Sequence, residues 1–74
     1  MSYNTGLDRM AIADRIIARR VELGLSRSNV DDRAGFHRGR LGTVENIGMI
    51  PTGERLDRLA RALETTPHWL LTGE

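Results

Sequence analysis

The sequence contains no cysteine and no lysine, one residue each of tryptophan, tyrosine and phenylalanine, and no long apolar run. Without cysteine, disulfide bridges and thiolate metal sites are excluded. The two histidines, His37 and His68, are too few and too far apart in sequence to suggest a metal site, so we expect no metal and no cofactor. The longest apolar runs, such as Met10–Ala13, are far shorter than the roughly 20 residues that span a membrane. The first residues also lack a signal-peptide pattern, so we expect a soluble, cytoplasmic protein.

An excess of charge of either sign is also missing, because 11 basic residues face 10 acidic ones and the formal net charge is +1. This near-neutral balance gives little support to nucleic-acid binding, so only the distribution of the charges can support it. All the basic residues are arginine, which favours bidentate contacts with phosphate and guanine but is equally expected from a GC-rich coding sequence. Four arginines and two aspartates lie between Arg27 and Arg40, so this stretch has a small local excess of positive charge.

The length of 74 residues indicates a single domain, 1–74, which buries about 60–65% of the surface of its unfolded chain. Apolar residues recur at helical spacing and nowhere alternate over the length of a strand, so the fold is predicted to be all-α. We expect a flexible segment over residues 1–7 and then five helices: about 8–23, 26–34 and 38–46, one capped by Thr52 with an apolar stripe that ends at Leu63, and a short one from Thr66 to Leu71. The predicted core consists of Ile12, Ile16, Leu23, Leu25, Val30, Ala34, Leu41, Val44, Leu56, Leu59, Leu63, Trp69 and Leu70.

The stretch from Leu25 to Glu45 carries the clearest functional pattern. Ser26 is a suitable N-cap for the first of two short helices, and Gly35 stands between the helices, where a residue that tolerates positive φ is needed. The second helix has its own apolar pair three residues apart, and this pair can face the core. A narrow polar face, suited to a DNA groove, is left for Arg38, Arg40 and Thr43.

Several short motifs in order resemble those of the lambda-repressor-like (XRE-type) helix-turn-helix domains of phage repressors, Cro proteins and bacterial relatives. They are Gly24-Leu25-Ser26, Gly35 in the turn, and the final Trp-Leu-Leu-Thr-Gly-Glu run that begins at Trp69. The resemblance spans about Ile12 to Glu74 and implies a compact five-helix domain with the helix-turn-helix at helices 2 and 3. It further implies a phage or prokaryotic transcriptional repressor that binds a palindromic operator in double-stranded DNA as a homodimer, with helix 3 in the major groove. Longer members continue from such an end into further domains, and the sequence leaves open whether this chain does.

The resemblance also assigns roles to individual positions. It implies contacts with DNA bases for Arg38, Gly39 and Thr43, and contacts with DNA phosphates for Arg27, Arg40 and Asn46. Arg40 is also a candidate for base contact, and each of these side chains has an alternative interpretation as an ordinary solvated surface residue. An ion pair between Arg20 and Glu45, which holds helix 3 against helix 1 in many members, is implied as well.

Three features depart from the family pattern, and the first two lie in the helix-turn-helix. Asp31 stands where members have a small residue packed between helices 2 and 3, and a buried carboxylate requires a partner. We expect that partner to be His37, Arg40 or the free amides at the N-terminus of helix 3. Gly39 and Gly42 are predicted to lie inside the recognition helix, where each costs about 1 kcal/mol relative to alanine.

The segment Ile47–Pro51 is predicted to be a loop with exposed apolar side chains and without the basic residues that relatives use there for phosphates. It indicates a dimer contact made by Met49, Ile50, Pro51 and Pro67, or alternatively a loop that folds onto its own core. The near-neutral charge and this apolar loop keep a second function open, that of an antitoxin-like or other protein-interaction module. No carboxylate pair, metal cluster or activated nucleophile is visible, so we do not expect an enzyme or a small-molecule substrate.

Overall fold

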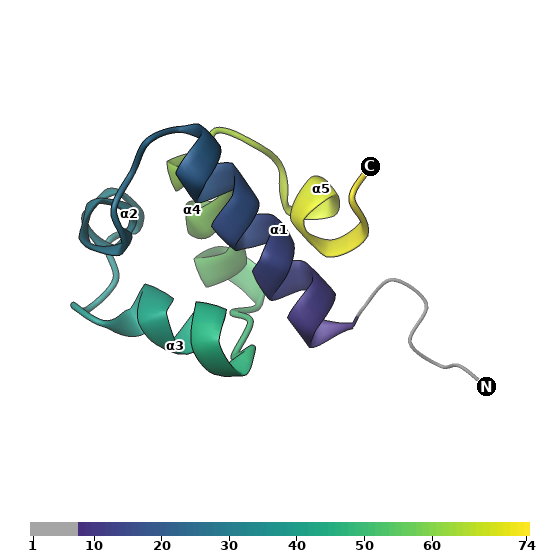
Figure 1. Ribbon diagram of the computed structural model, residues 1–74, viewed down its shortest axis with the longest axis horizontal. Helices are drawn as coiled ribbons and strands as arrows, with labels where there is room; N and C mark the ends of the chain where they lie inside the picture. Colours follow the sequence, from purple (N-terminus) through teal and green to yellow (C-terminus); the bar gives the residue numbers. More distant parts are fainter. Residues whose placement is uncertain (1–7) are drawn as a thin grey trace.

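The computed structural model describes residues 8–74, and within this range the chain forms five α-helices and no strand (Figure 1). The helices are α1 (Arg9–Glu22), α2 (Arg27–Ala34), α3 (Arg40–Ile47), α4 (Gly53–Ala62) and α5 (Pro67–Thr72). The prediction of an all-α, five-helix domain is confirmed. The expected flexible segment 1–7 lies outside the described residues. None of the five helices is long and apolar enough to cross a membrane.

The helices enclose one hydrophobic core. α2 and α3 lie at one end of the molecule and α5 at the other, while α1 passes in front of α4 in the view of Figure 1. α1 packs against α3 and α5, and α4 packs against α2 and α5. Most of the predicted core residues are buried, but Leu23, Leu25 and Trp69 are only half-buried. The prediction missed the small buried residue Ala62 and the partly buried Phe36.

Side-chain N-caps form at the starts of α1, α2 and α5. Asp8 accepts from two amides in the first turn of α1, and Thr66 accepts from an amide in the first turn of α5. Ser26 and Asn29 cap α2 reciprocally, because each side chain accepts from the other residue's backbone N–H. Thr52 does occupy the N-cap position of α4, but its side chain caps nothing.

The start of α3 differs from the prediction. The helix begins at Arg40 rather than at Arg38, because Gly39 has φ 91° and ψ −7°, a conformation that no helical residue adopts and that glycine tolerates best. Gly39 is therefore the N-cap of the helix, and only Gly42 lies inside it. Since glycine has no side chain, α3 has no side-chain cap of its own.

Arginines cap the C-terminal ends of the last two helices. The Arg15 guanidinium donates to two carbonyls of α5, and that of Arg19 donates to the carbonyls of Leu63 and Glu64 just after α4. Arg33 of α2 reaches the carbonyl of Ala62. A planar fork with five donors suits pairs of carbonyl oxygens, so these arginines serve the fold. The all-arginine composition thus has a third explanation besides contacts with phosphate and guanine and a GC-rich coding sequence, namely the capping of helix ends.

Candidate nucleic-acid interface

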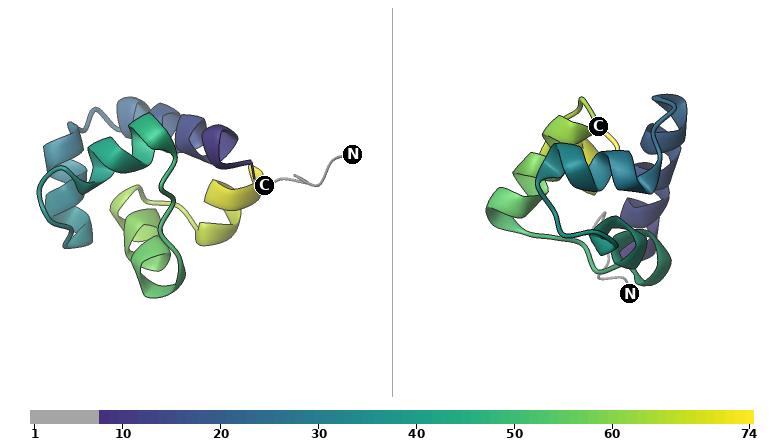
Figure 2. Two further views of the ribbon diagram at one scale, coloured as in Figure 1. Left: turned by 90° about the horizontal axis from the view of Figure 1, so that it is seen from below. Right: turned by 90° about the vertical axis from the view of Figure 1, so that its left-hand side faces the viewer.

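α3 buries one side and exposes the opposite side. Leu41, Val44 and Glu45 are buried against the rest of the domain. Positions three and four residues apart share a face of a helix, so the outward stripe consists of Gly39, Gly42, Thr43 and Asn46. Figure 2, left, views the molecule from the side on which α3 lies. Gly39 and Gly42 have no side chain and that of Thr43 is short, so a partner surface is able to approach the helix backbone closely near its N-terminal end, whereas Ile47 is exposed at its C-terminal end.

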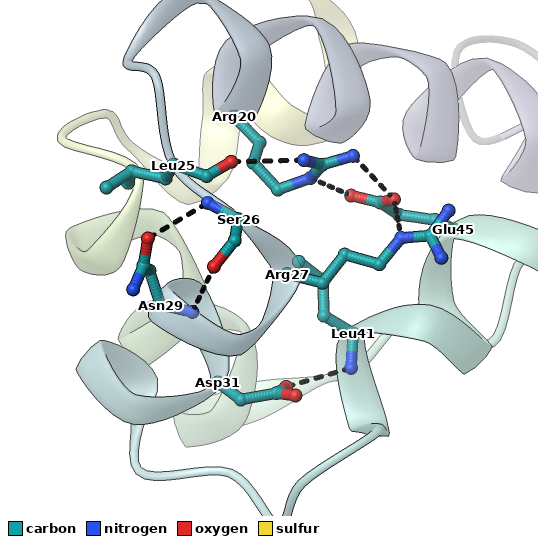
Figure 3. A network of polar contacts seen from close by, with 8 residues as sticks. All are labelled: Arg20, Leu25, Ser26, Arg27, Asn29, Asp31, Leu41 and Glu45. Atoms are coloured by element: carbon teal, nitrogen blue, oxygen red, sulfur yellow. Dashed lines mark hydrogen bonds and ion pairs between the residues drawn. The ribbon is translucent and has the colours of Figure 1, made fainter.

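Glu45 holds α3 to both α1 and α2. Its carboxylate is fully buried and accepts from Arg20 at two positions, with Nε to Oε2 at 2.7 Å and Nη2 to Oε1 at 3.1 Å (Figure 3). Arg20 also donates from Nη1 to the carbonyl of Leu25, just before α2. The structure therefore brings the expected pair together with bidentate geometry, which restricts the orientation of α3 relative to α1.

Arg27 is a second partner of Glu45 that the sequence did not indicate. Its Nε lies 2.9 Å from Oε1 of the same carboxylate, while 51% of its side chain stays exposed. Two guanidinium groups share one carboxylate here, so the junction of the three helices keeps a net positive charge. The ion pair holds Arg27 in place at the surface, at the start of α2, where the phosphate contact was expected.

Asp31 supplies the cap that α3 lacks. This side chain is 3% exposed, and it accepts from the amides of Gly39 and Leu41, both at 2.9 Å (Figure 3 shows the bond from Leu41). Of the three partners considered for it, the free amides at the start of α3 are the ones observed. An N-cap residue normally accepts from the second or third amide of its own helix. Here a residue of α2 takes that role for α3 and thereby restricts the angle between the two helices.

An open hollow of about 370 Å³ lies between the N-terminal ends of α2 and α3. It is lined by Arg27, Ser28, Asp31, Arg38, Gly39 and Gly42. Arg38 is exposed and lies in the turn before α3, not on the helix as predicted. The two guanidiniums beside the glycine backbone give this hollow the chemistry to bind an acceptor-rich, negatively charged partner.

The other predicted contact residues are distributed over different surfaces. Thr43 lies on the outward stripe, and its hydroxyl is 3.4 Å from the carbonyl of Gly39, to which it donates. Asn46 is exposed near the end of the same stripe. Arg40 points away from the stripe, because its guanidinium lies over the ring of Phe36, 5.7 Å from the centroid. The sequence analysis did not single out Phe36, although an aromatic residue directly after a turn glycine could have indicated a partly buried side chain.

The loop after α3 is less exposed than the sequence indicated. Met49 is 51% exposed, as expected, but Pro51 is buried and Ile50 packs against the core. The expectation of exposed apolar side chains throughout the loop is therefore wrong for these two residues. Pro67, the fourth residue of the expected dimer contact, is half-buried at the start of α5. Within residues 8–74 no cluster of potential metal ligands is present.

Comparisons with known proteins agree with this architecture. A helix-turn-helix family model matches residues 16–70. A comparison with curated protein sequences gives no significant match.

Solved structures give several close similarities. The c2 repressor of phage P22, in complex with a synthetic operator, is 30% identical with a TM-score of 0.78, and the alignment covers 85% of this chain and 96% of that one. The N-terminal DNA-binding domain of SinR from Bacillus subtilis is 31% identical with a TM-score of 0.75, covering 86% and 93%. The restriction-modification controller protein C.AhdI from Aeromonas hydrophila is 27% identical with a TM-score of 0.78, covering 85% and 96%.

Proposed function

This chain belongs to the helix-turn-helix family, and on this premise we propose that it is a transcriptional repressor that binds a specific operator with α3 in the major groove. It has the fold of DNA-binding transcription regulators such as phage repressors and controller proteins. Repression, rather than activation, rests on analogy with the P22 c2 repressor. Such a role places the protein in the cytoplasm, together with the DNA.

The proposal rests mainly on how α3 is attached to α1 and α2 and on which of its residues face outward. Glu45 and Asp31 attach it to α1 and α2, while Gly39, Gly42 and Thr43 leave the first turns of its outward face with little side-chain bulk. A helix held in one orientation, with little side-chain bulk on the outer face of its first turns, fits the width and depth of the major groove.

Within this arrangement base recognition falls mainly to Arg38. It lines the hollow beside the outward stripe and has the bidentate geometry that matches the O6 and N7 atoms of guanine. Thr43 lies on the same stripe and offers an apolar contact to a thymine methyl group. Gly39 contributes close approach rather than a hydrogen bond, because its amide already donates to Asp31.

Phosphate contacts on either side of the groove fall to Arg27, Arg40 and Asn46. The expected homodimer would place two copies of α3 about one DNA turn, roughly 34–36 Å, apart on a palindromic site. Met49 is the most exposed of the four residues expected at the dimer contact, whereas Ile50 and Pro67 are half-buried and Pro51 is buried.

A second candidate function, a protein-interaction module, is favoured by one observation. Met10, Ile47 and Met49 are each about half exposed, and Gly48 between the last two packs against the start of α1, so exposed apolar side chains lie on two neighbouring segments and could form a common apolar patch. An antitoxin-like protein would use such a patch to bind a protein ligand.

Titration of a labelled duplex at two salt concentrations tests the proposal. If Arg27 and Arg40 each neutralise one phosphate in both subunits, the slope of log K against log salt is about −3.6, and affinity falls roughly 100-fold between 50 and 200 mM salt. Binding that does not change with salt, or no binding to any duplex, would contradict DNA recognition and favour the protein-interaction module.

A further inference from the structure

A second hollow, which the proposed base contacts do not use, lies between the turn that follows α2 and the helix α4. It has a volume of about 160 Å³ and is lined by Gly35, Phe36, His37, Arg40, Arg55 and Arg58. We refer to it as the arginine pocket. Three of its six lining residues carry a permanent positive charge.

Phe36 organises the guanidinium groups of this pocket. Arg40 from α3 and Arg58 from α4 both lie over its ring, at 5.7 and 5.8 Å from the centroid. The negative face of an aromatic ring attracts cations, so Phe36 helps to hold both guanidiniums at the pocket that they line. The terminal nitrogen Nη1 of Arg58 also lies over the backbone at Gly35, where an added Cβ would be 3.7 Å away.

No carboxylate neutralises the pocket within residues 8–74. The ion pairs of this range involve Arg19, Arg20, Arg27, Arg33 and Arg61, but none of the three arginines of the pocket. The Nε atoms of Arg40 and Arg58 are buried and have no hydrogen-bond partner there. Buried donors are normally satisfied, so these two show that the described part of the chain supplies too few acceptors to the guanidiniums of this pocket.

We propose that the arginine pocket binds a phosphate group. A tetrahedral oxyanion offers several acceptors to converging guanidinium donors, and charge-assisted bonds of this kind are the strongest that arginine makes. The inference rests on the proposed function in one respect: Arg40 is the first residue of α3, so a backbone phosphate beside the groove that α3 enters is the nearest source. A free phosphate compound is the other source of the same chemistry.

Titration of the protein with inorganic phosphate at constant ionic strength tests the pocket without DNA. Amide resonances of Gly35, Phe36 and His37 are expected to shift saturably, and the Arg58→Gln variant is expected to bind at least fivefold more weakly. Arg61→Gln is the matched control on α4, because Arg61 is 79% exposed in its side chain and pairs with Asp57 outside the pocket. Arg55→Gln provides a second variant at an exposed position if Arg58→Gln does not fold. No saturable shift, or phosphate binding by both the Arg58→Gln and the Arg55→Gln variant equal to that of the unmodified protein, would overturn the proposal.

Duplex binding then identifies the source of the phosphate. If the DNA backbone supplies it, Arg58→Gln makes the salt slope less negative by about 0.9 for each bound subunit, while Arg61→Gln leaves it unchanged. An unchanged slope together with lost phosphate binding supports the pocket and assigns it to a free phosphate compound. If the unmodified protein binds no duplex, the proposed function fails, whereas the phosphate titration still decides on the pocket.

Discussion

Replacement of Asp31 by alanine is expected to destabilise the domain by about 2–3 kcal/mol. The carboxylate accepts two hydrogen bonds from amides of α3, and bonds to a charged group contribute about 1.5–3 kcal/mol each. Relief from burying the charge offsets part of this loss, but the Leu41 amide then lies buried without a partner, which costs about 1–3 kcal/mol. For a domain of this size the melting temperature is expected to fall by about 8–24 °C.

Asp32→Ala is the matched control, because Asp32 is the next residue on α2 and its side chain is exposed. Its effect is expected to stay within about 0.5 kcal/mol. Thermal melting followed by circular dichroism measures both variants, and hydrogen exchange at the Gly39 and Leu41 amides reports the local effect. Equal melting temperatures for the two variants would refute the role of Asp31 as the cap of α3.

Three further substitutions test the recognition unit. Glu45→Gln is expected to lower the free energy of unfolding by about 2 kcal/mol or more, because Arg20 and Arg27 lose their shared carboxylate. The surface control Glu22→Gln is expected to change it by less than about 1 kcal/mol. Equal unfolding curves for the two variants would contradict the stabilising role of the Glu45 ion pairs. Gly39→Ala is expected to destabilise the domain by about 1–2 kcal/mol, because position 39 has a positive φ. Gly42→Ala is expected to stabilise the domain by up to about 1 kcal/mol, because Gly42 lies inside α3 with open space around it. Melting temperatures that change in the same direction for both variants would contradict the observed start of α3. Arg38→Ala is expected to weaken binding to a selected operator by about 1–3 kcal/mol and to relax the base preference at one operator position. Equal weakening on a scrambled duplex would contradict base recognition by Arg38 and leave only a phosphate contact.

Local signals in the sequence predicted the helices well. The N-caps at Asp8, Ser26 and Thr66 were predictable because a capping side chain bonds to amides only two or three residues away. The turn glycine Gly35 was predictable for the same reason, since positive φ at a helix end is a local requirement. The start of α3 was misplaced because helical spacing cannot distinguish a glycine inside a helix from one that precedes it.

The contacts between helices were only partly predictable. The pairing of Arg20 with Glu45 came from the resemblance, whereas the second partner, Arg27, depends on where α2 is placed in space. Three partners stayed open for Asp31 because only tertiary structure decides which donors reach a buried carboxylate. The arginine pocket went unnoticed because its residues come from the turn, α3 and α4, which lie apart in the sequence.

Selection of bound duplexes from a random pool tests the central claim most directly, since it measures DNA binding, base preference and half-site spacing together. If the protein is a dimeric repressor that reads the major groove with α3, the enriched duplexes are expected to share a partly palindromic motif with half-sites about one helical turn, roughly 10 base pairs, apart. A pool that shows no enriched motif after selection would contradict sequence-specific recognition by this helix-turn-helix.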